Sequence, residues 1–198
     1  MSKMNLPNKL TIFRVILIVP FIILLLGGQA GWFGDNTFVT DMIALAIFII
    51  ASLTDLIDGK IARKYNLITD FGKFMDPLAD KFLVIAAMLG ILAYCDDLRA
   101  VFVWAAAIVI FRELAVTSIR LVAAQKSGLV VAASWLGKIK TTTQMICICT
   151  VLLEPVLFPV FAENHILSYV TTAVMTVMTL WSGIDYLRTY WKFLDPQK

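Results

Sequence analysis

The chain has 198 residues, of which 60% are hydrophobic and 16% are charged, and its mean hydropathy is +0.86. About a quarter of the residues of a water-soluble domain are charged. The composition therefore excludes an ordinary soluble domain and indicates an integral membrane protein. We expect a single membrane domain over residues 1–198 and no nucleic-acid partner.

Six apolar segments are long enough to cross a bilayer as helices, which takes about 20 residues each. We predict helices over residues 10–26, 38–62, 71–94, 100–124, 131–153 and 166–187. No internal repeat is evident among these segments. The expected fold is an all-α integral membrane protein with six transmembrane helices.

The basic residues are distributed unevenly between the two sides of the predicted bundle. The loops 27–39, 95–99 and 154–165 together hold one basic residue, Arg99, of the 17 in the chain. Lysine and arginine are enriched in the cytoplasmic loops of membrane proteins. We therefore predict a multi-pass protein with both termini in the cytoplasm and an active site at the cytoplasmic membrane interface.

Four aspartates lie at the end of the second predicted segment and the start of the third, where carboxylates beside a bilayer are costly and usually functional. Asp55 and Asp58 are three residues apart and Asp76 and Asp80 are four apart, so each pair shares a helical face. Two such faces turned toward each other form a cage of oxygen ligands, which Mg²⁺, Mn²⁺ and Ca²⁺ prefer. Four carboxylates favour two ions over one, and paired ions support phosphoryl-type transfer. The alternative is that these aspartates are interfacial charges that face water.

The residues between these pairs suit a nucleotide. Gly59 and Ala62 form a small-residue surface that a flat group such as a nucleobase could approach. Arg63 is a partner for phosphate oxygens, and Gly72 would admit a close ligand. Thr69 could cap the next helix or bond a phosphate.

The stretch from Asp55 to Asp80 reads D-x2-D-G-x2-A-R-x8-G-x3-D-x3-D, with eight fixed residues over 26 positions. This pattern resembles the signature of the CDP-alcohol phosphatidyltransferase family. Members of that family transfer a phosphatidyl group from CDP-diacylglycerol to an alcohol and release CMP. The resemblance implies that Asp55, Asp58, Asp76 and Asp80 hold two divalent cations, Mg²⁺ or Mn²⁺. It further implies that Asp80 is catalytic and deprotonates the acceptor hydroxyl.

The resemblance also implies where the CDP group binds. It places contacts to CDP at Gly59, Arg63 and Thr69, while Asn8 and Thr11 either cap the first helix or contact the cytidine. The predicted CDP-diacylglycerol-binding residues lie in the first three segments: Asn8, Thr11, Gly59, Ala62, Arg63, Thr69 and Gly72.

Three flanking strings bear on the acceptor alcohol. The strings 5–14, 112–114 and 136–141 resemble those of bacterial phosphatidylglycerophosphate synthases, which use glycerol 3-phosphate. A phosphorylated acceptor requires cations. The predicted acceptor-phosphate-binding residues are basic side chains of the fourth and fifth segments: Arg112, Arg120, Lys138 and Lys140. Alternatively, Arg112 pairs with Glu113 inside the bundle, and the lysines extend to lipid headgroups.

The predicted reaction is phosphatidyl transfer from CDP-diacylglycerol to glycerol 3-phosphate, giving phosphatidylglycerophosphate and CMP in a bacterial plasma membrane. Another acceptor would make the chain a cardiolipin synthase or a phosphatidylinositol phosphate synthase. A cation-coupled transporter is the alternative from a different class, but it would place carboxylates near the bilayer midplane. The resemblance further implies a homodimer surrounded by membrane lipids.

Overall fold

The computed structural model describes residues 4–34, 37–65, 67, 69–127, 134–157 and 164–191, and this part of the chain is helical without any strand. The helices are α1 (Leu6–Gln29), α2 (Thr37–Lys64), α3 (Asp70–Tyr94), α4 (Asp96–Ser127), α5 (Trp135–Leu157) and α7 (Ile166–Tyr190). Each predicted segment corresponds to one of them, with ends displaced by a few residues. The predicted start of the fifth helix, residues 131–133, lies outside the described residues. The all-α class is confirmed.

Four helices, α1, α2, α4 and α7, are long and apolar enough to span a bilayer. Within the described residues, α3 and α5 do not meet this criterion, although six spans were expected. The first 12 residues of α3 include five charged side chains. Charged side chains within a membrane bundle usually mark its functional part, so α3 is a strong candidate to carry functional residues.

The starts of α1 and α3 are both capped by polar side chains. Asn5 caps α1 and accepts a hydrogen bond from the Asn8 amide at 3.1 Å. Thr69 caps α3, and its Oγ1 accepts from the Gly72 amide at 3.0 Å. The capping alternative for Asn8 and Thr11 is therefore wrong, which leaves their side chains available for tertiary contacts.

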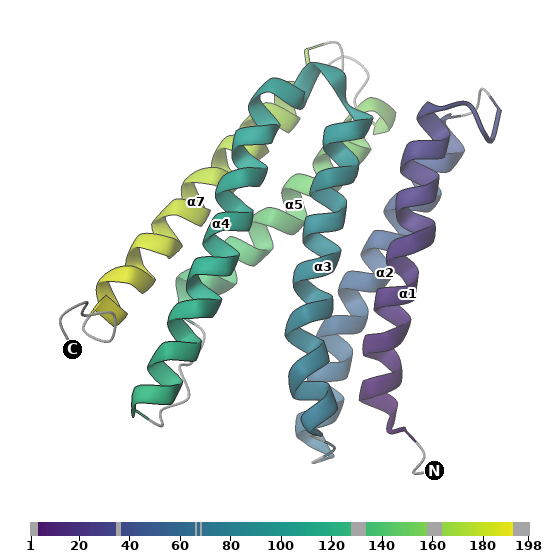
Figure 1. Ribbon diagram of the computed structural model, residues 1–198. Helices are drawn as coiled ribbons and strands as arrows, with labels where there is room; N and C mark the ends of the chain where they lie inside the picture. Colours follow the sequence, from purple (N-terminus) through teal and green to yellow (C-terminus); the bar gives the residue numbers. More distant parts are fainter. Residues whose placement is uncertain are drawn as a thin grey trace.

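The helices pack in two groups, which are connected by contacts of α3 with α4 and α5 and of α2 with α5 (Figure 1). One group contains α1, α2 and α3, and the other contains α4, α5 and α7, while α3 also contacts α4 and α5. The start of α1, the end of α2, the start of α3 and the end of α7 lie toward the same end of the bundle (Figure 1). The motif aspartates of α2 and α3 are therefore near each other because these two helix ends meet.

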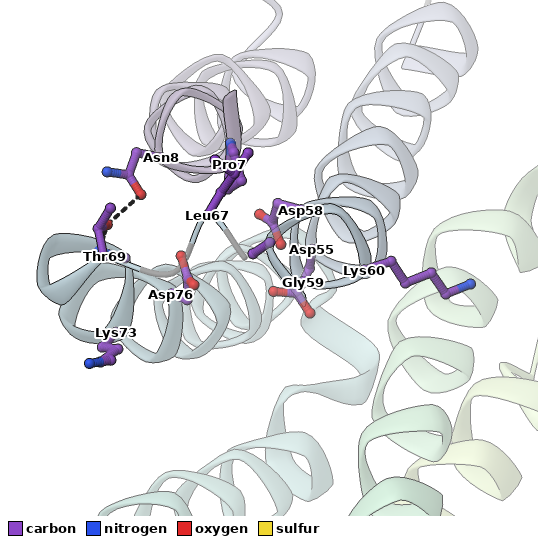
Figure 2. A pocket seen from close by; sticks show the side chains of 12 residues that line it. Pro7, Asn8, Asp55, Asp58, Gly59, Lys60, Leu67, Thr69, Lys73 and Asp76 are labelled. Carbon is purple, nitrogen blue, oxygen red and sulfur yellow. Dashed lines mark hydrogen bonds between the residues drawn. The ribbon is translucent and has the colours of Figure 1, made fainter. Parts of the chain in front are cut away.

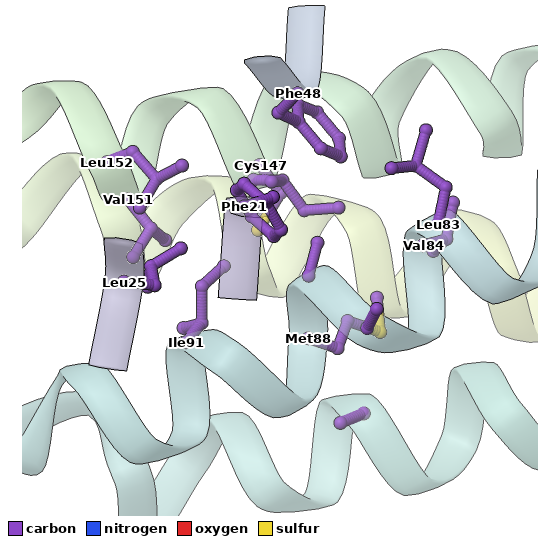
Figure 3. Packing of buried hydrophobic residues seen from close by; sticks show 14 of the residues in the cluster. Phe21, Leu25, Phe48, Leu83, Val84, Met88, Ile91, Cys147, Val151 and Leu152 are labelled. Atoms are coloured by element: carbon purple, nitrogen blue, oxygen red, sulfur yellow. The ribbon is translucent and has the colours of Figure 1, made fainter. Parts of the chain in front are cut away.

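The apolar core occupies the helix segments beyond the aspartates. Phe21 of α1 and Phe48 of α2 pack with ring centroids 5.8 Å apart and ring planes tilted by 37°, and Met88 of α3 and Cys147 of α5 pack in the same cluster (Figure 3). All four side chains are buried. Close packing of this kind holds the helices in fixed positions relative to one another. The apolar core therefore also fixes the positions of the helix segments at the polar end of the bundle.

Candidate active site

A cavity of about 400 Å³ opens where α1, α2 and α3 meet. We call it the acidic cavity because Asp55, Asp58 and Asp76 contribute to its wall. Its lining residues come from all three helices and the α2–α3 connection: Pro7, Asn8, Asp55, Asp58, Gly59, Lys60, Ala62, Leu67, Thr69, Gly72, Lys73 and Asp76. Figure 2 shows Asp55 and Asp58 of α2 beside Asp76 of α3, with the Lys60 side chain extending away from them. Both carboxylates of the α2 pair therefore line the cavity that Asp76 of α3 also lines.

Polar side chains of α1 contact all three of these aspartates. Arg14 Nη1 donates to Asp55 Oδ1 at 2.6 Å, and Arg14 Nη2 donates to Asp58 Oδ2. The Thr11 hydroxyl lies 2.7 Å from Asp76 Oδ1. Sequence reasoning assigned no site role to Arg14. The available signal was a single arginine inside a long apolar run, three residues after Thr11 and so on the same helical face.

The other predicted nucleotide-binding residues lie along the same wall. The Thr69 hydroxyl donates to Asn8 Oδ1 at 3.0 Å, which ties the start of α3 to α1 (Figure 2). A Cβ at Gly72 would lie 3.0 Å from Asn8 Oδ1. Gly72 therefore permits the close approach of α1 to α3 in addition to lining the cavity. Gly59 and Ala62 line the cavity from α2, whereas the side chain of Arg63 lies outside the described part of the chain.

A second, much smaller cavity of about 10 Å³ adjoins α3, α4 and α5. We call it the mixed-charge cleft because acidic and basic side chains face each other across it. Its lining residues are Asp80, Lys81, Val84, Ile85, Glu113, Lys140, Thr141 and Gln144. Asp80 lies one helical turn beyond Asp76 on α3, and its charge interacts with those of Asp55 and Lys140. Of the four predicted metal ligands, Asp80 therefore lines the cleft and not the acidic cavity, one helical turn from Asp76.

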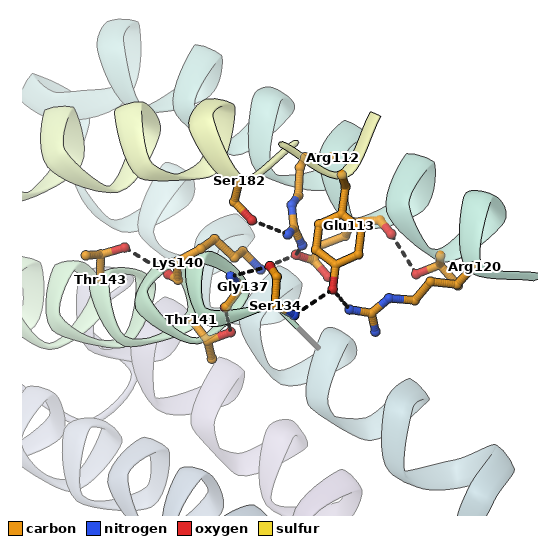
Figure 4. Close-up of polar contacts among 11 residues, drawn as sticks. Arg112, Glu113, Arg120, Ser134, Gly137, Lys140, Thr141, Thr143 and Ser182 are labelled. Carbon is orange, nitrogen blue, oxygen red and sulfur yellow. Dashed lines mark hydrogen bonds and ion pairs between the residues drawn. The ribbon is translucent and has the colours of Figure 1, made fainter. Parts of the chain in front are cut away.

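Glu113 connects two of the basic side chains that were predicted to bind the acceptor phosphate (Figure 4). Glu113 Oε1 accepts from Arg112 Nη1 at 3.1 Å and also pairs with Lys140 Nζ. Arg112 Nη2 donates to the Ser182 hydroxyl at 2.5 Å, which fixes the guanidinium against α7. The predicted pairing of Arg112 with Glu113 is present. Sequence reasoning missed Lys81 and Gln144, because neither belongs to a motif.

The other two predicted acceptor residues lie elsewhere. The Lys138 side chain is exposed and is not in the lining of either cavity. The Arg120 guanidinium donates to the Tyr186 hydroxyl and stacks over the same ring at 4.9 Å (Figure 4). The structure therefore brings Arg112 and Lys140 together at Glu113, and it holds Arg120 on α7 instead.

The donor atoms of the acidic cavity fit a hard divalent cation. Carboxylate oxygens from α2 and α3 face one space, and such oxygens are the ligands that Mg²⁺ and Mn²⁺ prefer. Within the described residues, no three acidic, histidine or cysteine side chains are gathered into a complete metal-ligand cluster. The assignment of metal ligands to the four aspartates therefore stays a prediction, and it is based on the type and position of the donors.

The fold and site together define a membrane-embedded helical protein with a polar reaction site at one end of its bundle. A model of the CDP-alcohol phosphatidyltransferase family matches residues 4–181. The chain belongs to this family, and the predicted family is confirmed.

Similar proteins of known name include a CDP-diacylglycerol–glycerol-3-phosphate 3-phosphatidyltransferase of Bacillus subtilis, which is 45% identical over 96% of this chain and 97% of the relative. A protein of the same name from Salmonella choleraesuis is 36% identical over 93% and 94%. A probable phosphatidylglycerophosphate synthase of Mycobacterium tuberculosis is 35% identical over 92% of this chain and 80% of the relative.

Proposed function

We propose that this protein transfers a phosphatidyl group from CDP-diacylglycerol to glycerol 3-phosphate, which yields phosphatidylglycerophosphate and CMP. One structural observation supports this proposal above the others. Consecutive turns of α3 place Asp76 in the acidic cavity and Asp80 in the mixed-charge cleft. A nucleotide-linked donor and a phosphorylated acceptor can therefore meet at adjoining sites near Asp80, once the acceptor separates Lys140 from Glu113. The similar proteins from Bacillus and Salmonella carry the name of this reaction.

The acidic cavity is the proposed site of the CDP group. Asp55, Asp58, Asp76 and Asp80 would hold two divalent cations, Mg²⁺ or Mn²⁺. When bound, these cations would neutralise the diphosphate and stabilise the charge that develops on it. Asn8, Thr69 and Gly72 line the cavity on the α1–α3 side, while the acyl chains of the donor remain in the lipid. The proposed contact from Arg63 belongs to the same site.

The mixed-charge cleft is the proposed entry for glycerol 3-phosphate. Its phosphate would bind Arg112 and Lys140, with Lys138 and Arg120 contributing positive charge from farther away. Asp80 would accept the proton of the acceptor hydroxyl, whose oxygen then attacks the phosphorus of the phosphatidyl group. The bond from this phosphorus to the CMP oxygen breaks, and CMP leaves. Holding two substrates side by side supplies much of the rate enhancement, because a hydroxyl is a weak nucleophile.

We further propose that the site faces the cytoplasm of a bacterial cell, with both termini on that side and the protein assembled as a homodimer. The basic residues of the chain are concentrated at the helix ends that carry the aspartates. The start of α1 and the end of α7 lie toward this same end (Figure 1). Glycerol 3-phosphate is water-soluble and would reach the site from that side.

An acceptor screen tests the reaction. Purified protein is incubated with CDP-diacylglycerol and Mg²⁺ or Mn²⁺, and CMP release is measured with glycerol 3-phosphate, phosphatidylglycerol, inositol phosphate or serine. We expect release with glycerol 3-phosphate and its loss in EDTA. Release with another acceptor and none with glycerol 3-phosphate would show that the acceptor is wrong but that the family chemistry is right.

A further inference from the structure

Arg14 is a fully buried arginine in a helix that is otherwise apolar around it. Its exposed fraction is 0%, and it lies within the membrane-spanning helix α1. A buried guanidinium is unfavourable unless charged partners and hydrogen bonds compensate it. The structure supplies such partners in Asp55 and Asp58, together with a 3.5 Å contact from Arg14 Nε to the Thr54 hydroxyl.

The two ion pairs use the two terminal nitrogens of the planar Arg14 guanidinium. Arg14 Nη1 binds Oδ1 of Asp55, and Nη2 binds Oδ2 of Asp58. The guanidinium is a rigid fork, so these bonds fix the relative orientation of the two carboxylates. A lysine ammonium would retain the charge but not the fork.

Arg14 contacts the aspartates from behind the cavity wall. Asp55 and Asp58 line the acidic cavity, whereas Arg14 is not among its lining residues and is closed off from solvent. Each of the two ion pairs uses one oxygen of its own carboxylate. A carboxylate has a second oxygen, so a bond to Arg14 and a bond to a cation in the cavity are compatible.

Thr11 repeats this arrangement for the other helix. It precedes Arg14 by three residues, has an exposed fraction of 0%, and lies 2.7 Å from Asp76 Oδ1. One face of α1 therefore contacts carboxylates from both α2 and α3. Outer contacts of this kind orient metal ligands, and removing one typically weakens metal binding.

We propose that Thr11 and Arg14 are positioning residues that hold Asp55, Asp58 and Asp76 in the orientation that binds a divalent cation. This inference rests on the divalent-cation site of the proposed function. Because both side chains act through the aspartates, their removal weakens cation binding even when no lipid or nucleotide is present.

The test measures Mn²⁺ binding to the purified full-length protein by electron paramagnetic resonance of the free ion, together with the melting temperature in EDTA. Arg14→Lys keeps the charge and removes the fork, and we expect its Mn²⁺ dissociation constant to rise about tenfold or more. Thr11→Val keeps the shape and removes the hydroxyl, and we expect a rise of at least about threefold.

Glu154→Gln is the matched control, because Glu154 is also a fully buried ionisable residue but lies near the end of α5, far along the helix from Lys140, where it accepts from the Ser168 amide at 2.8 Å. This control should lose melting temperature with unchanged Mn²⁺ affinity. The same pattern in Arg14→Lys would overturn the inference, because it would show a structural role only. If Arg14→Lys does not fold, an unchanged dissociation constant in Thr11→Val overturns it. Absence of Mn²⁺ binding in the wild type would instead contradict the cation site of the proposed function.

Discussion

The acidic cavity and the mixed-charge cleft share helix α3 but differ in how ready they are for a ligand. The acidic cavity has a volume of about 400 Å³, whereas the cleft has about 10 Å³. A space of about 10 Å³ holds roughly one water molecule. The first site is therefore open to a group as large as a nucleotide, and the second is filled by its own side chains.

The charges of the two sites explain this difference. In the acidic cavity three aspartates face a space, and the compensating Arg14 lies behind them. In the cleft, Glu113 and Lys140 neutralise each other directly. Under the proposed function, glycerol 3-phosphate must therefore separate this pair to bind Lys140. The same residue types can therefore form either an open site or a self-paired site, depending on where the counter-charge lies.

Neutralising Asp80, which lines the mixed-charge cleft one helical turn from the acidic cavity, should have the largest effect. We expect Asp80→Asn to lower turnover by about 10²- to 10⁴-fold, because the acceptor hydroxyl loses its base. Binding of CDP-diacylglycerol should fall far less, since Asp80 does not line the acidic cavity and the three carboxylates that do are unchanged. Turnover is measured as CMP release, and the dissociation constant of CDP-diacylglycerol is measured separately without the acceptor.

Asp185→Asn is the control for this change, because Asp185 is a partly buried aspartate of α7 that lines neither cavity. It should retain turnover. Equal losses of binding and turnover in Asp80→Asn would indicate that Asp80 serves only as a cation ligand.

Removing Lys140 tests the assignment of the cleft to the acceptor. We expect Lys140→Met to raise the KM for glycerol 3-phosphate by roughly 10- to 100-fold, the value of one charge-assisted hydrogen bond. The KM for CDP-diacylglycerol should stay within about twofold, because the donor site is separate. Initial rates of CMP release give both constants. Lys64→Met, which removes an exposed lysine at the end of α2, should change neither KM. If Lys140→Met changes the KM for CDP-diacylglycerol by more than about twofold, the two sites are not separate.

Neutralising Glu113 tests whether the cleft is held closed by its own ion pair. Glu113→Gln leaves Arg112 and Lys140 without their carboxylate, which should lower the melting temperature by roughly 6 to 12 °C. Inorganic phosphate should restore part of this loss, because it can replace the missing anion. Thermal unfolding with and without phosphate measures both effects. Glu154→Gln, which removes a different buried carboxylate, should lose stability without recovery in phosphate. If phosphate raises the melting temperature of the wild type and of Glu113→Gln equally, phosphate does not take the place of the Glu113 carboxylate.

The smallest expected effect concerns the wall of the acidic cavity. Thr69 caps α3 and bonds Asn8 on α1. Thr69→Ala should lower the free energy of unfolding by about 1 kcal/mol, the usual value of an N-cap. Thr69→Ser keeps the hydroxyl and should retain most of this stability in thermal unfolding. Similar losses in both variants would show that the methyl group, and not the cap, is what matters.

The sequence alone was sufficient to predict the helices and the class of reaction. Long apolar runs specify membrane helices because backbone polar groups must be satisfied within each segment in lipid. The spacing of Asp55 and Asp58 is a local property of a helix, so their common face was predictable. The signature from Asp55 to Asp80 was also sufficient for the family, because its fixed residues lie close together in the chain.

Which distant charges meet depends on how the helices pack against one another. Arg14 is 41 residues from Asp55, and Lys140 is 27 residues from Glu113. Lys138 and Lys140 are two residues apart, so they cannot share a helical face, and the sequence could not indicate which one points inward. The packing of α5 places Lys140 inside and leaves Lys138 exposed. Helical periodicity is determined locally, whereas the rotation of each helix in the bundle depends on all of its neighbours.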